Sequence, residues 1–222
     1  MSYQVRLQSV LERIETAKQN SVFKENIKLV AVSKTVTSCE IEKLYNAGCG
    51  IFGENRVQDL KQKHDELKNL DIEWHFIGRL QVNKINQLIS LRPALIHSCD
   101  SLKLALEIDK RLKDKNQKLD ILLQINSAEE ETKAGVETED AVKIYEDILH
   151  SCPHLNLKGV MSIGAHTDDV KLIQKSFEAT REIYERILPL GAKYCSMGMS
   201  GDFELAIKCG ANMIRLGSIL FK

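Results

Sequence analysis

Strand signals and helix signals alternate along the whole chain, and this alternation limits the possible folds more than any other feature of the sequence. Apolar runs rich in Val, Ile and Leu indicate buried strands, whereas apolar residues spaced three and four apart indicate amphipathic helices. Eight segments have the character of strands: 27–33, 50–52, 72–77, 94–97, 119–125, 157–161, 193–196 and 213–216. Strands that alternate with helices are typical of parallel α/β architectures.

A helix is predicted after each strand except the last, and one more precedes the first strand. The opening helix is predicted from an apolar stripe between Tyr3 and Ala17. No long linker or low-complexity tract interrupts the alternation, so we predict one domain over residues 1–222. Eight such units favour a closed (β/α)8 TIM barrel over an open sheet, here with an extra N-terminal helix.

Charge and composition exclude several classes of protein. Lys plus Arg and Asp plus Glu both total 31, so the chain has a formal net charge of zero and lacks the basic field that holds nucleic acid. No apolar segment approaches the roughly 20 residues that span a bilayer. The six cysteines form no Cys-x-x-Cys pair and no signal peptide is recognisable, which favours reduced thiols in the cytoplasm. We therefore expect a soluble cytoplasmic protein with a small-molecule ligand and no nucleic-acid or membrane partner.

In a barrel of this kind, functional residues lie on the loops that follow the strands. Lys34 follows the apolar run 28–33 and is therefore expected at the barrel mouth. An amine kept free by partial burial or by a neighbouring cation can attack an aldehyde and form a Schiff base. Candidates for that cation are Arg79, Lys84 and Arg215. Taken alone, a lysine at a strand end is more often a solvated charge.

The end of the chain has the features of a phosphate site. Residues 196–202 are predicted to form a loop that ends at a helix N-cap, where Ser200 offers its hydroxyl beside unpaired backbone amides. Gly217 and Ser218 follow the last strand, where barrels often bind phosphate. The other interpretation is an ordinary capped helix, because Asp202 and Glu204 already complement the helix dipole.

Two further motifs do not indicate binding sites. Residues 48–53 match G-x-G-x-x-G, but the string spans a strand instead of joining a strand to a helix, so no dinucleotide site is predicted. His150, Cys152 and His154 bring three possible metal ligands together, but no second ligand cluster accompanies them. We predict no metal site.

Longer strings spread over nearly the whole chain resemble those of a known family. They are Leu-Val-Ala-Val-Ser-Lys-Thr at 29–35, Phe-Gly-Glu-Asn at 52–55, His-Phe-Ile-Gly-Arg-Leu-Gln-Val-Asn-Lys at 75–84, Gln-Ile-Asn at 124–126, Lys-Ala-Gly at 133–135, Gly-Val-Met at 159–161, Ser-Met-Gly-Met-Ser-Gly-Asp at 196–202 and Arg-Leu-Gly-Ser at 215–218. Together they resemble the pyridoxal phosphate homeostasis family, the stand-alone relatives of the N-terminal barrel of alanine racemase.

The resemblance implies that the protein binds pyridoxal 5′-phosphate as a cofactor. Lys34 would form the Schiff base, and Arg215 would face the pyridine nitrogen. Asn55 and Met161 would lie beside the ring. Ser200, Gly217 and Ser218 would hold the phosphate.

The resemblance also implies a role without catalysis. An arginine at the ring nitrogen is a permanent cation, so it disfavours the protonated pyridinium that strong carbanion chemistry needs. Racemisation needs two positioned acid/base groups, and residues 219–222 leave no room for the second domain that supplies one of them in alanine racemases. We therefore expect no catalytic residues and a monomeric carrier that controls the intracellular level of pyridoxal phosphate, with PLP-dependent apoenzymes as candidate partners.

Two alternatives stay open. One is a low-activity amino acid racemase that uses Lys34 with an unidentified second base, and loss of the α-hydrogen of alanine in deuterated water distinguishes it. The other is a Schiff-base aldolase acting on a phosphorylated sugar, which predicts a colourless protein whose lysine traps a ketose phosphate.

Overall fold

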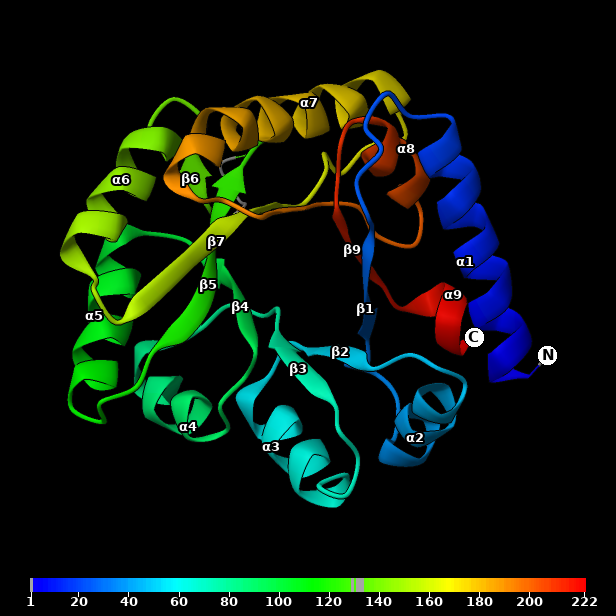
Figure 1. Cartoon of the computed structure of the whole chain (residues 1–222), viewed down its shortest axis with the longest axis horizontal. Helices are drawn as coiled ribbons and strands as arrows, with labels where there is room; N and C mark the ends of the chain where they lie inside the picture. Colours follow the sequence, from blue (N-terminus) through cyan, green and yellow to red (C-terminus); the bar gives the residue numbers. More distant parts are fainter. Residues whose placement is uncertain (1, 129, 131–133) are drawn as a thin grey trace.

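The computed structural model describes residues 2–128, 130 and 134–222. Within them, eight parallel strands close into a barrel in the order β4-β3-β2-β1-β9-β8-β7-β5, and β4 pairs with β5 to complete the circle (Figure 1). The strands are β1 (Lys28–Val32), β2 (Ile51–Glu54), β3 (Glu73–Phe76), β4 (Leu95–Cys99), β5 (Leu119–Asn126), β7 (Leu155–Ser162), β8 (Tyr194–Ser196) and β9 (Met213–Leu216). The predicted (β/α)8 barrel is confirmed.

Helices surround this barrel on the outside (Figure 1). They are α2 (Ser38–Asn46), α3 (Val57–Glu66), α4 (Ile85–Ser90), α5 (Leu102–Lys113), α6 (Ala141–Ser151), α7 (Val170–Ile187) and α8 (Phe203–Lys208), with short 3-10 turns at Val82–Lys84 and Leu188–Leu190. The extra N-terminal helix is α1 (Tyr3–Gln19), which packs against α8 and against α9 (Ser218–Phe221). The rings of Tyr3 and Phe221 meet edge to face with their centroids 6.2 Å apart, so the first and last helices touch.

The structure adds two short elements to the predicted ones and shifts the ends of several strands, among them β2, β4 and β7. β2 continues through Gly53 and Glu54, which pair with His75 and Phe76 of β3. A two-residue strand, β6 (Val136–Glu137), pairs with the end of β5. The last four-residue helix, α9, follows β9. Both additions are too short to leave a hydrophobic period in the sequence.

The barrel interior is filled by inward-facing side chains of its strands, as in other barrels of this size. An apolar cluster on β1, β4, β5, β7 and β9 consists of Val30, Leu95, Leu122, Met161 and Met213. These residues close the barrel as a packed core, so ligand-accessible space is expected only at its ends.

Two buried histidines share this interior. His75 Nδ1 on β3 lies 2.9 Å from His97 Nε2 on β4, and His97 Nδ1 lies 3.2 Å from the hydroxyl of Ser196 on β8. Because β8 does not neighbour β4, the contact crosses the inside of the barrel. Burial lowers the pKa of both imidazoles, that of His97 well below its ordinary value.

We expect these histidines to make the fold sensitive to mild acid. Below the ordinary histidine pKa of about 6.5, the unfolded chain takes up protons that His75 and His97 do not accept in the folded protein. The free energy of unfolding should therefore fall as the pH is lowered from about 7 to about 5. Urea unfolding measured across this range checks the slope, which His97→Gln should reduce and His150→Asn, at an exposed position, should leave unchanged. A wild-type profile that stays flat would contradict this prediction.

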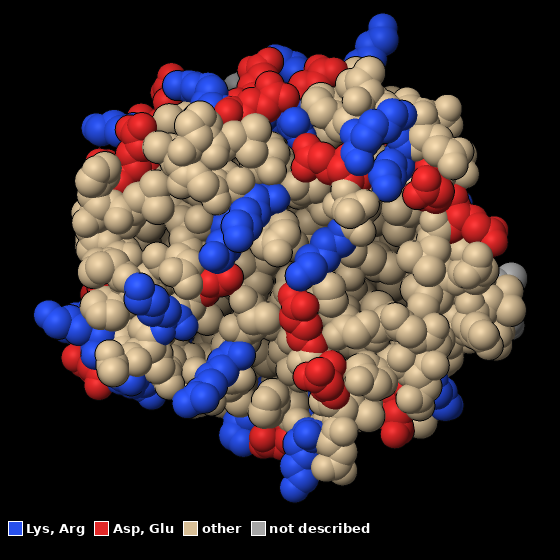
Figure 2. Space-filling view, in the orientation of Figure 1, with Lys and Arg blue, Asp and Glu red and all other residues tan. Residues whose placement is uncertain are grey.

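Figure 2 shows how charged side chains are distributed over one face of the molecule. Acidic and basic side chains are intermixed over the face shown in Figure 2, where neither sign forms a continuous patch. In the described part of the chain, no helix is both long and apolar enough to cross a membrane.

Candidate functional site

One cavity opens at the carboxyl end of the barrel, where β1 meets β9. Its volume is about 610 Å³, and its walls come from the turn after β1, the loop after β8, and the end of β9 with the helix that follows. The lining residues are Val32, Lys34, Thr35, Val36, Glu40, Met199, Ser200, Gly201, Arg215, Gly217, Ser218, Phe221 and Lys222. Since β1 and β9 pair from Lys28–Met213 to Ala31–Leu216, the two ends of the sequence build this site together.

Lys34 lies in the turn that begins two residues beyond the last residue of β1, and its side chain is exposed. The preceding residue, Ser33, is fully buried and fixes the turn from below. Its N–H donates to the carbonyl of Gly53 at 3.0 Å, and its carbonyl accepts from Lys63 Nζ at 2.7 Å. Lys34 is thus an accessible amine on a backbone anchor that the barrel holds in place.

That anchor contains a buried ion pair. Glu54, the last residue of β2, is fully buried, and its Oε1 accepts from Lys63 Nζ at 2.7 Å and from the hydroxyl of Ser33 at 2.6 Å. The other carboxylate oxygen, Oε2, has no hydrogen-bond partner among the described residues. Lys63 reaches this point from α3. The pair joins β2 and α3 to the residue that precedes Lys34.

Ser200 is not the helix cap that the sequence predicts. The N-cap of α8 is Asp202, whose Oδ1 accepts from the N–H of Met199 at 2.6 Å, and Ser200 lies in the turn before it. The Ser200 hydroxyl instead accepts from the N–H of Gly217 at 3.1 Å. The loop after β8 and the end of β9 are therefore tied together directly beside the cavity.

Arg215 lies almost wholly inside the barrel, with 4% of its surface exposed. One terminal nitrogen donates to the carbonyl and hydroxyl of Ser196 at 2.9 and 2.8 Å, and the other donates to the carbonyl of Ser162 at 2.8 Å. Burial lowers the pKa of Arg215 to about 10, which still leaves a cation at neutral pH. Three hydrogen bonds to the barrel wall hold that charge at the floor of the cavity.

Five of the seven predicted site residues, all of which are described, line this cavity; Asn55 and Met161 do not. Met161 belongs to the apolar cluster inside the barrel. Asn55 borders a separate cavity of about 510 Å³ together with Arg79 and Lys84, so neither of these cations lines the cavity of Lys34. Lys133, in one of the strings that carry the resemblance, lies outside the described residues.

The cavity also contains residues that the sequence did not indicate. Glu40 and Thr37 form the capping box of α2, and Glu40 Oε1 accepts from the Tyr3 hydroxyl at 3.3 Å. Lys222 supplies a second amine. The sequence predicts the capping box between Thr37 and Glu40, and the structure confirms it. The sequence does not predict that Glu40 lies at the cavity, because that position depends on how the turn after β1 folds.

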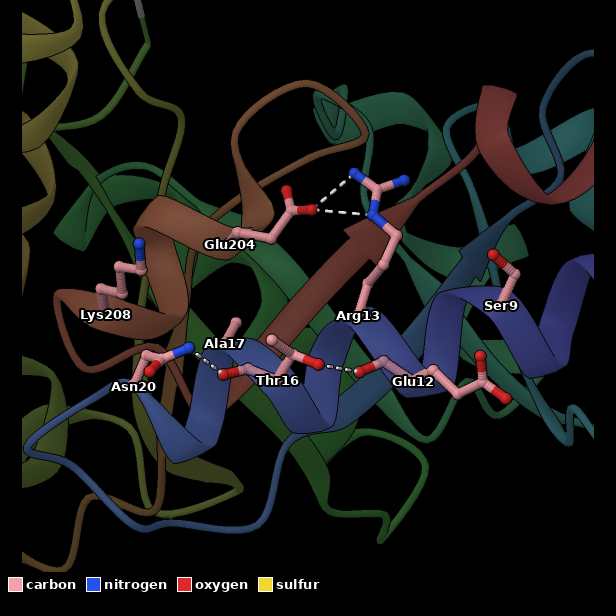
Figure 3. A pocket seen from close by; sticks show the side chains of 8 residues that line it. All are labelled: Ser9, Glu12, Arg13, Thr16, Ala17, Asn20, Glu204 and Lys208. Atoms are coloured by element: carbon pink, nitrogen blue, oxygen red, sulfur yellow. Dashed lines mark hydrogen bonds and ion pairs between the residues drawn. The ribbon is translucent and has the colours of Figure 1, made fainter.

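A further hollow lies on the outer surface between α1 and α8 (Figure 3). There Arg13 forms an ion pair with Glu204 at 2.6 Å and stacks over the ring of Phe203. Asn20 donates to the carbonyl of Thr16 at 2.9 Å. The contacts of Arg13 join α1 to α8, whereas the bond of Asn20 closes the end of α1 itself, and none of these residues is a predicted site residue.

Known proteins match this chain over almost its full length. The family profile described as "Alanine racemase, N-terminal domain" matches residues 5–222. The protein of Helicobacter pylori strain ATCC 700392 / 26695 named "Pyridoxal phosphate homeostasis protein" is 51% identical over 222 residues, which are 100% of this chain and 99% of that protein. A protein of the same name from Aquifex aeolicus strain VF5 is 42% identical over 220 residues, 97% of this chain and 96% of that protein.

Solved structures give the same relationship. A protein of unknown function from Bifidobacterium adolescentis has a TM-score of 0.93 and 31% identity, covering 99% of this chain and 94% of that chain. PipY of Synechococcus elongatus PCC7942, solved with PLP bound, has a TM-score of 0.85 and 29% identity, covering 99% of this chain and 100% of that chain. With a closed barrel and sequence matches along its whole length, the chain belongs to the pyridoxal phosphate homeostasis family, whose fold is that of the N-terminal domain of alanine racemase.

Proposed function

We propose that this protein binds pyridoxal 5′-phosphate at the cavity between β1 and β9 and takes part in controlling the intracellular level of that cofactor. The observation that carries the proposal is the convergence of Lys34 with Arg215 and the 200–201 and 217–218 segments on one cavity. The relatives named for pyridoxal phosphate homeostasis and the PLP-bound PipY structure support the same ligand.

The donors at this cavity fit a phosphorylated aldehyde. Ser200 and Ser218 offer hydroxyls, and Gly201 and Gly217 allow a phosphate to approach the backbone closely. A Cβ on Gly217 would lie only 3.3 Å from the carbonyl oxygen of Val32, so a side chain there would narrow the cavity. We assign the phosphate to Ser200, Gly217 and Ser218.

The cofactor, when bound, supplies an aldehyde that condenses with the amine of Lys34 and releases water, giving a Schiff base. Lys34 is exposed at the cavity, which suits repeated loading and release of a ligand. Asn55 and Met161 do not line the cavity, so we propose that they support the surroundings of the ring without contacting it.

Arg215 favours carriage over catalysis in this proposal. A guanidinium donates hydrogen bonds and accepts no proton, so it disfavours a protonated ring nitrogen if it faces that atom. Such a site stabilises a carbanion poorly. We therefore propose that the protein is not an enzyme.

The second candidate function is a weak amino acid racemase, which needs an acid/base group besides Lys34. No tyrosine lines the described walls of the cavity. The remaining titratable groups at hand are Glu40, which already accepts hydrogen bonds from the N–H of Thr37 and from Tyr3, and Lys222. Exchange of the α-hydrogen of L- or D-alanine in deuterated water, abolished by Glu40→Gln or Lys222→Ala, would favour this alternative.

We propose a monomer that exchanges its cofactor with PLP-dependent apoenzymes in the cytoplasm. None of the six cysteines, all of which are described, forms a disulfide, which suits a reducing compartment. A light-scattering mass of twice 25.1 kDa would contradict the monomer.

The test is reductive labelling of the wild-type protein. Purified protein is mixed with pyridoxal phosphate, its visible spectrum is recorded, and borohydride is added before peptide mapping. We expect a yellow absorption band that borohydride removes and one labelled site at Lys34. Lys222 is the other lysine at the cavity and is the informative alternative site. A protein that develops no colour and carries no label would overturn the cofactor assignment and favour the phosphorylated-sugar aldolase.

A further inference from the structure

A continuous row of hydrogen bonds crosses the barrel interior from the cavity to the opposite end. Arg215 contacts Ser196 Oγ at 2.8 Å, and Ser196 Oγ contacts His97 Nδ1 at 3.2 Å. His97 Nε2 contacts His75 Nδ1 at 2.9 Å, and His75 Nε2 contacts Glu73 Oε1 at 2.9 Å. Ser196, His97 and His75 are buried, and no more than 1% of the His75 side chain is exposed. Glu73 is the first residue of β3, so the row ends at the amino-terminal face.

The carboxylate at one end sets the direction of the bonds through the two neutral rings, and the guanidinium at the other end sets the direction of its own bond to Ser196. A guanidinium can only donate, so Ser196 Oγ accepts from Arg215 and its own proton is free to go to His97 Nδ1. At the other end, an ionised carboxylate can only accept, so His75 Nε2 must carry the proton. The hydrogen bond from His75, with that from Lys28, lowers the pKa of Glu73 to about 2 and keeps it ionised at neutral pH.

The proton positions in the middle of the row follow from the Glu73 end, because both rings are neutral. The Ser196 hydroxyl can donate to His97 Nδ1 or accept from it, so the Arg215 end alone does not set the tautomer of His97. His75 donates from Nε2, so its Nδ1 is the acceptor that His97 needs. Two neutral imidazoles, each protonated at Nε2, satisfy all four bonds without conflict. The low pKa values of both rings agree with this neutral state.

We infer that Ser196, His97 and His75 form a one-way hydrogen-bond chain that couples Arg215, at the proposed cofactor cavity, to Glu73 on the opposite face of the barrel. Its functional part rests on the proposed function; its structural part does not. The three inner residues are positioning residues for Arg215, and Glu73 is the terminal acceptor that orients them.

The hydrogen-bond chain can transmit a change at one end to the other for a physical reason. Charged groups at both ends strengthen their hydrogen bonds, and aligned bonds in a low-dielectric interior polarise one another. Glu73 is held by Lys28, whose Nζ lies 2.8 Å from Oε1 and which also stacks over the ring of Tyr194. Removing the carboxylate takes away the group that fixes the tautomer of His75, and through it that of His97.

The first experiment tests the chain in the protein without added cofactor. Long-range proton–nitrogen NMR spectra of labelled protein distinguish the two histidine tautomers. We expect both His75 and His97 to be neutral and protonated at Nε2 at neutral pH. A proton on Nδ1 of either ring, or an imidazolium, would overturn the inference whatever the protein binds.

The second experiment compares two carboxylates on the same face of the barrel. Glu73→Ala removes the terminal acceptor, whereas Asp120→Ala removes a similarly exposed carboxylate at the start of β5 that pairs with Lys158 and contacts neither histidine. We expect Glu73→Ala to mix the tautomers of His97, and Asp120→Ala to leave them unchanged.

The same pair tests the coupling to the cofactor cavity. Glu73→Ala should raise the Kd for pyridoxal phosphate roughly 2- to 30-fold and shift the absorption band of the bound cofactor. Asp120→Ala should change neither. Equal effects of the two variants, or tautomers that change in Glu73→Ala while the band and Kd do not, would overturn the coupling.

A matched pair of buried serines gives the shorter-range test. Ser196→Ala breaks the chain beside Arg215, while Ser162→Ala keeps it because Arg215 uses only the backbone carbonyl of Ser162. Ser196→Ala should move the band and Ser162→Ala should not. If the wild-type protein binds no pyridoxal phosphate, the proposed function fails, and the tautomer spectra still decide whether the chain exists.

Discussion

Replacing Lys34 with alanine is expected to abolish both the yellow absorption band and the borohydride-stable label. The proposed bond forms at this amine, and an alanine cannot replace it. The phosphate contacts at Ser200, Gly217 and Ser218 remain in the variant, so weak binding of pyridoxal phosphate should persist without colour. Equilibrium dialysis beside the visible spectrum measures the two properties separately.

Two control variants make this result specific. Lys34→Arg keeps the positive charge but provides a guanidinium, which stays protonated and does not attack an aldehyde, so it should lose the label as completely as alanine does. Lys222→Ala removes the other lysine at the cavity and should leave the label in place. A Lys34→Ala protein that is labelled to the wild-type extent would show that another amine carries the cofactor.

Replacing Lys63 with methionine is expected to lower the free energy of unfolding by about 3–5 kcal/mol. The side chain of Glu54 is fully buried and that of Lys63 is 10% exposed, so the substitution leaves a buried carboxylate without its cation. One oxygen of Glu54 already has no partner among the described residues, so the site has little capacity to compensate. Urea unfolding gives the change from the midpoint, provided that the slope with urea stays constant.

The same helix supplies the control for this prediction. Lys61 pairs with Asp65 on the exposed side of α3, with 52% and 56% of the two side chains accessible. Lys61→Met should therefore change stability by no more than about 1 kcal/mol. The double variant Glu54→Gln, Lys63→Met should recover part of the loss, because the buried charge is then absent. A loss in Lys63→Met no larger than in Lys61→Met would show that Glu54 is not held as a buried anion.

The alternation of strands and helices was sufficient to predict the barrel, because buried parallel strands such as β5 have a nearly continuous apolar sequence. It failed where a strand is built from residues that rarely form strands. Gly53 and Glu54 extend β2 because Gly53 packs closely against Val30 and because Lys63 neutralises Glu54, and neither partner adjoins them in sequence. Local pattern cannot reveal such a contact.

The sequence predicts only those residues of the candidate site that lie near the ends of predicted strands. Lys34 and Gly217 could be placed on one rim because each follows a strand, and Arg215 lies within the last strand, two residues before Gly217. Ser200 lies on that rim as predicted, but its hydroxyl accepts from the N–H of Gly217 after β9 and does not cap the helix, whose N-cap position is occupied by Asp202. The sequence does not predict the contact between His75 and His97, because it exists only after β3 and β4 are paired and the barrel is closed.

The pairing of β1 with β9 determines when, during synthesis and folding, the barrel can close. β1 and β9 lie side by side although they are far apart in the sequence, so this seam can form only after residues 213–216 have been synthesised. Contacts between residues so far apart in sequence form slowly during folding. Because the cavity opens along the same seam, a nascent chain would have no place for the ligand until β9 arrives. Closure of the barrel and competence to bind would then be gained in a single late event.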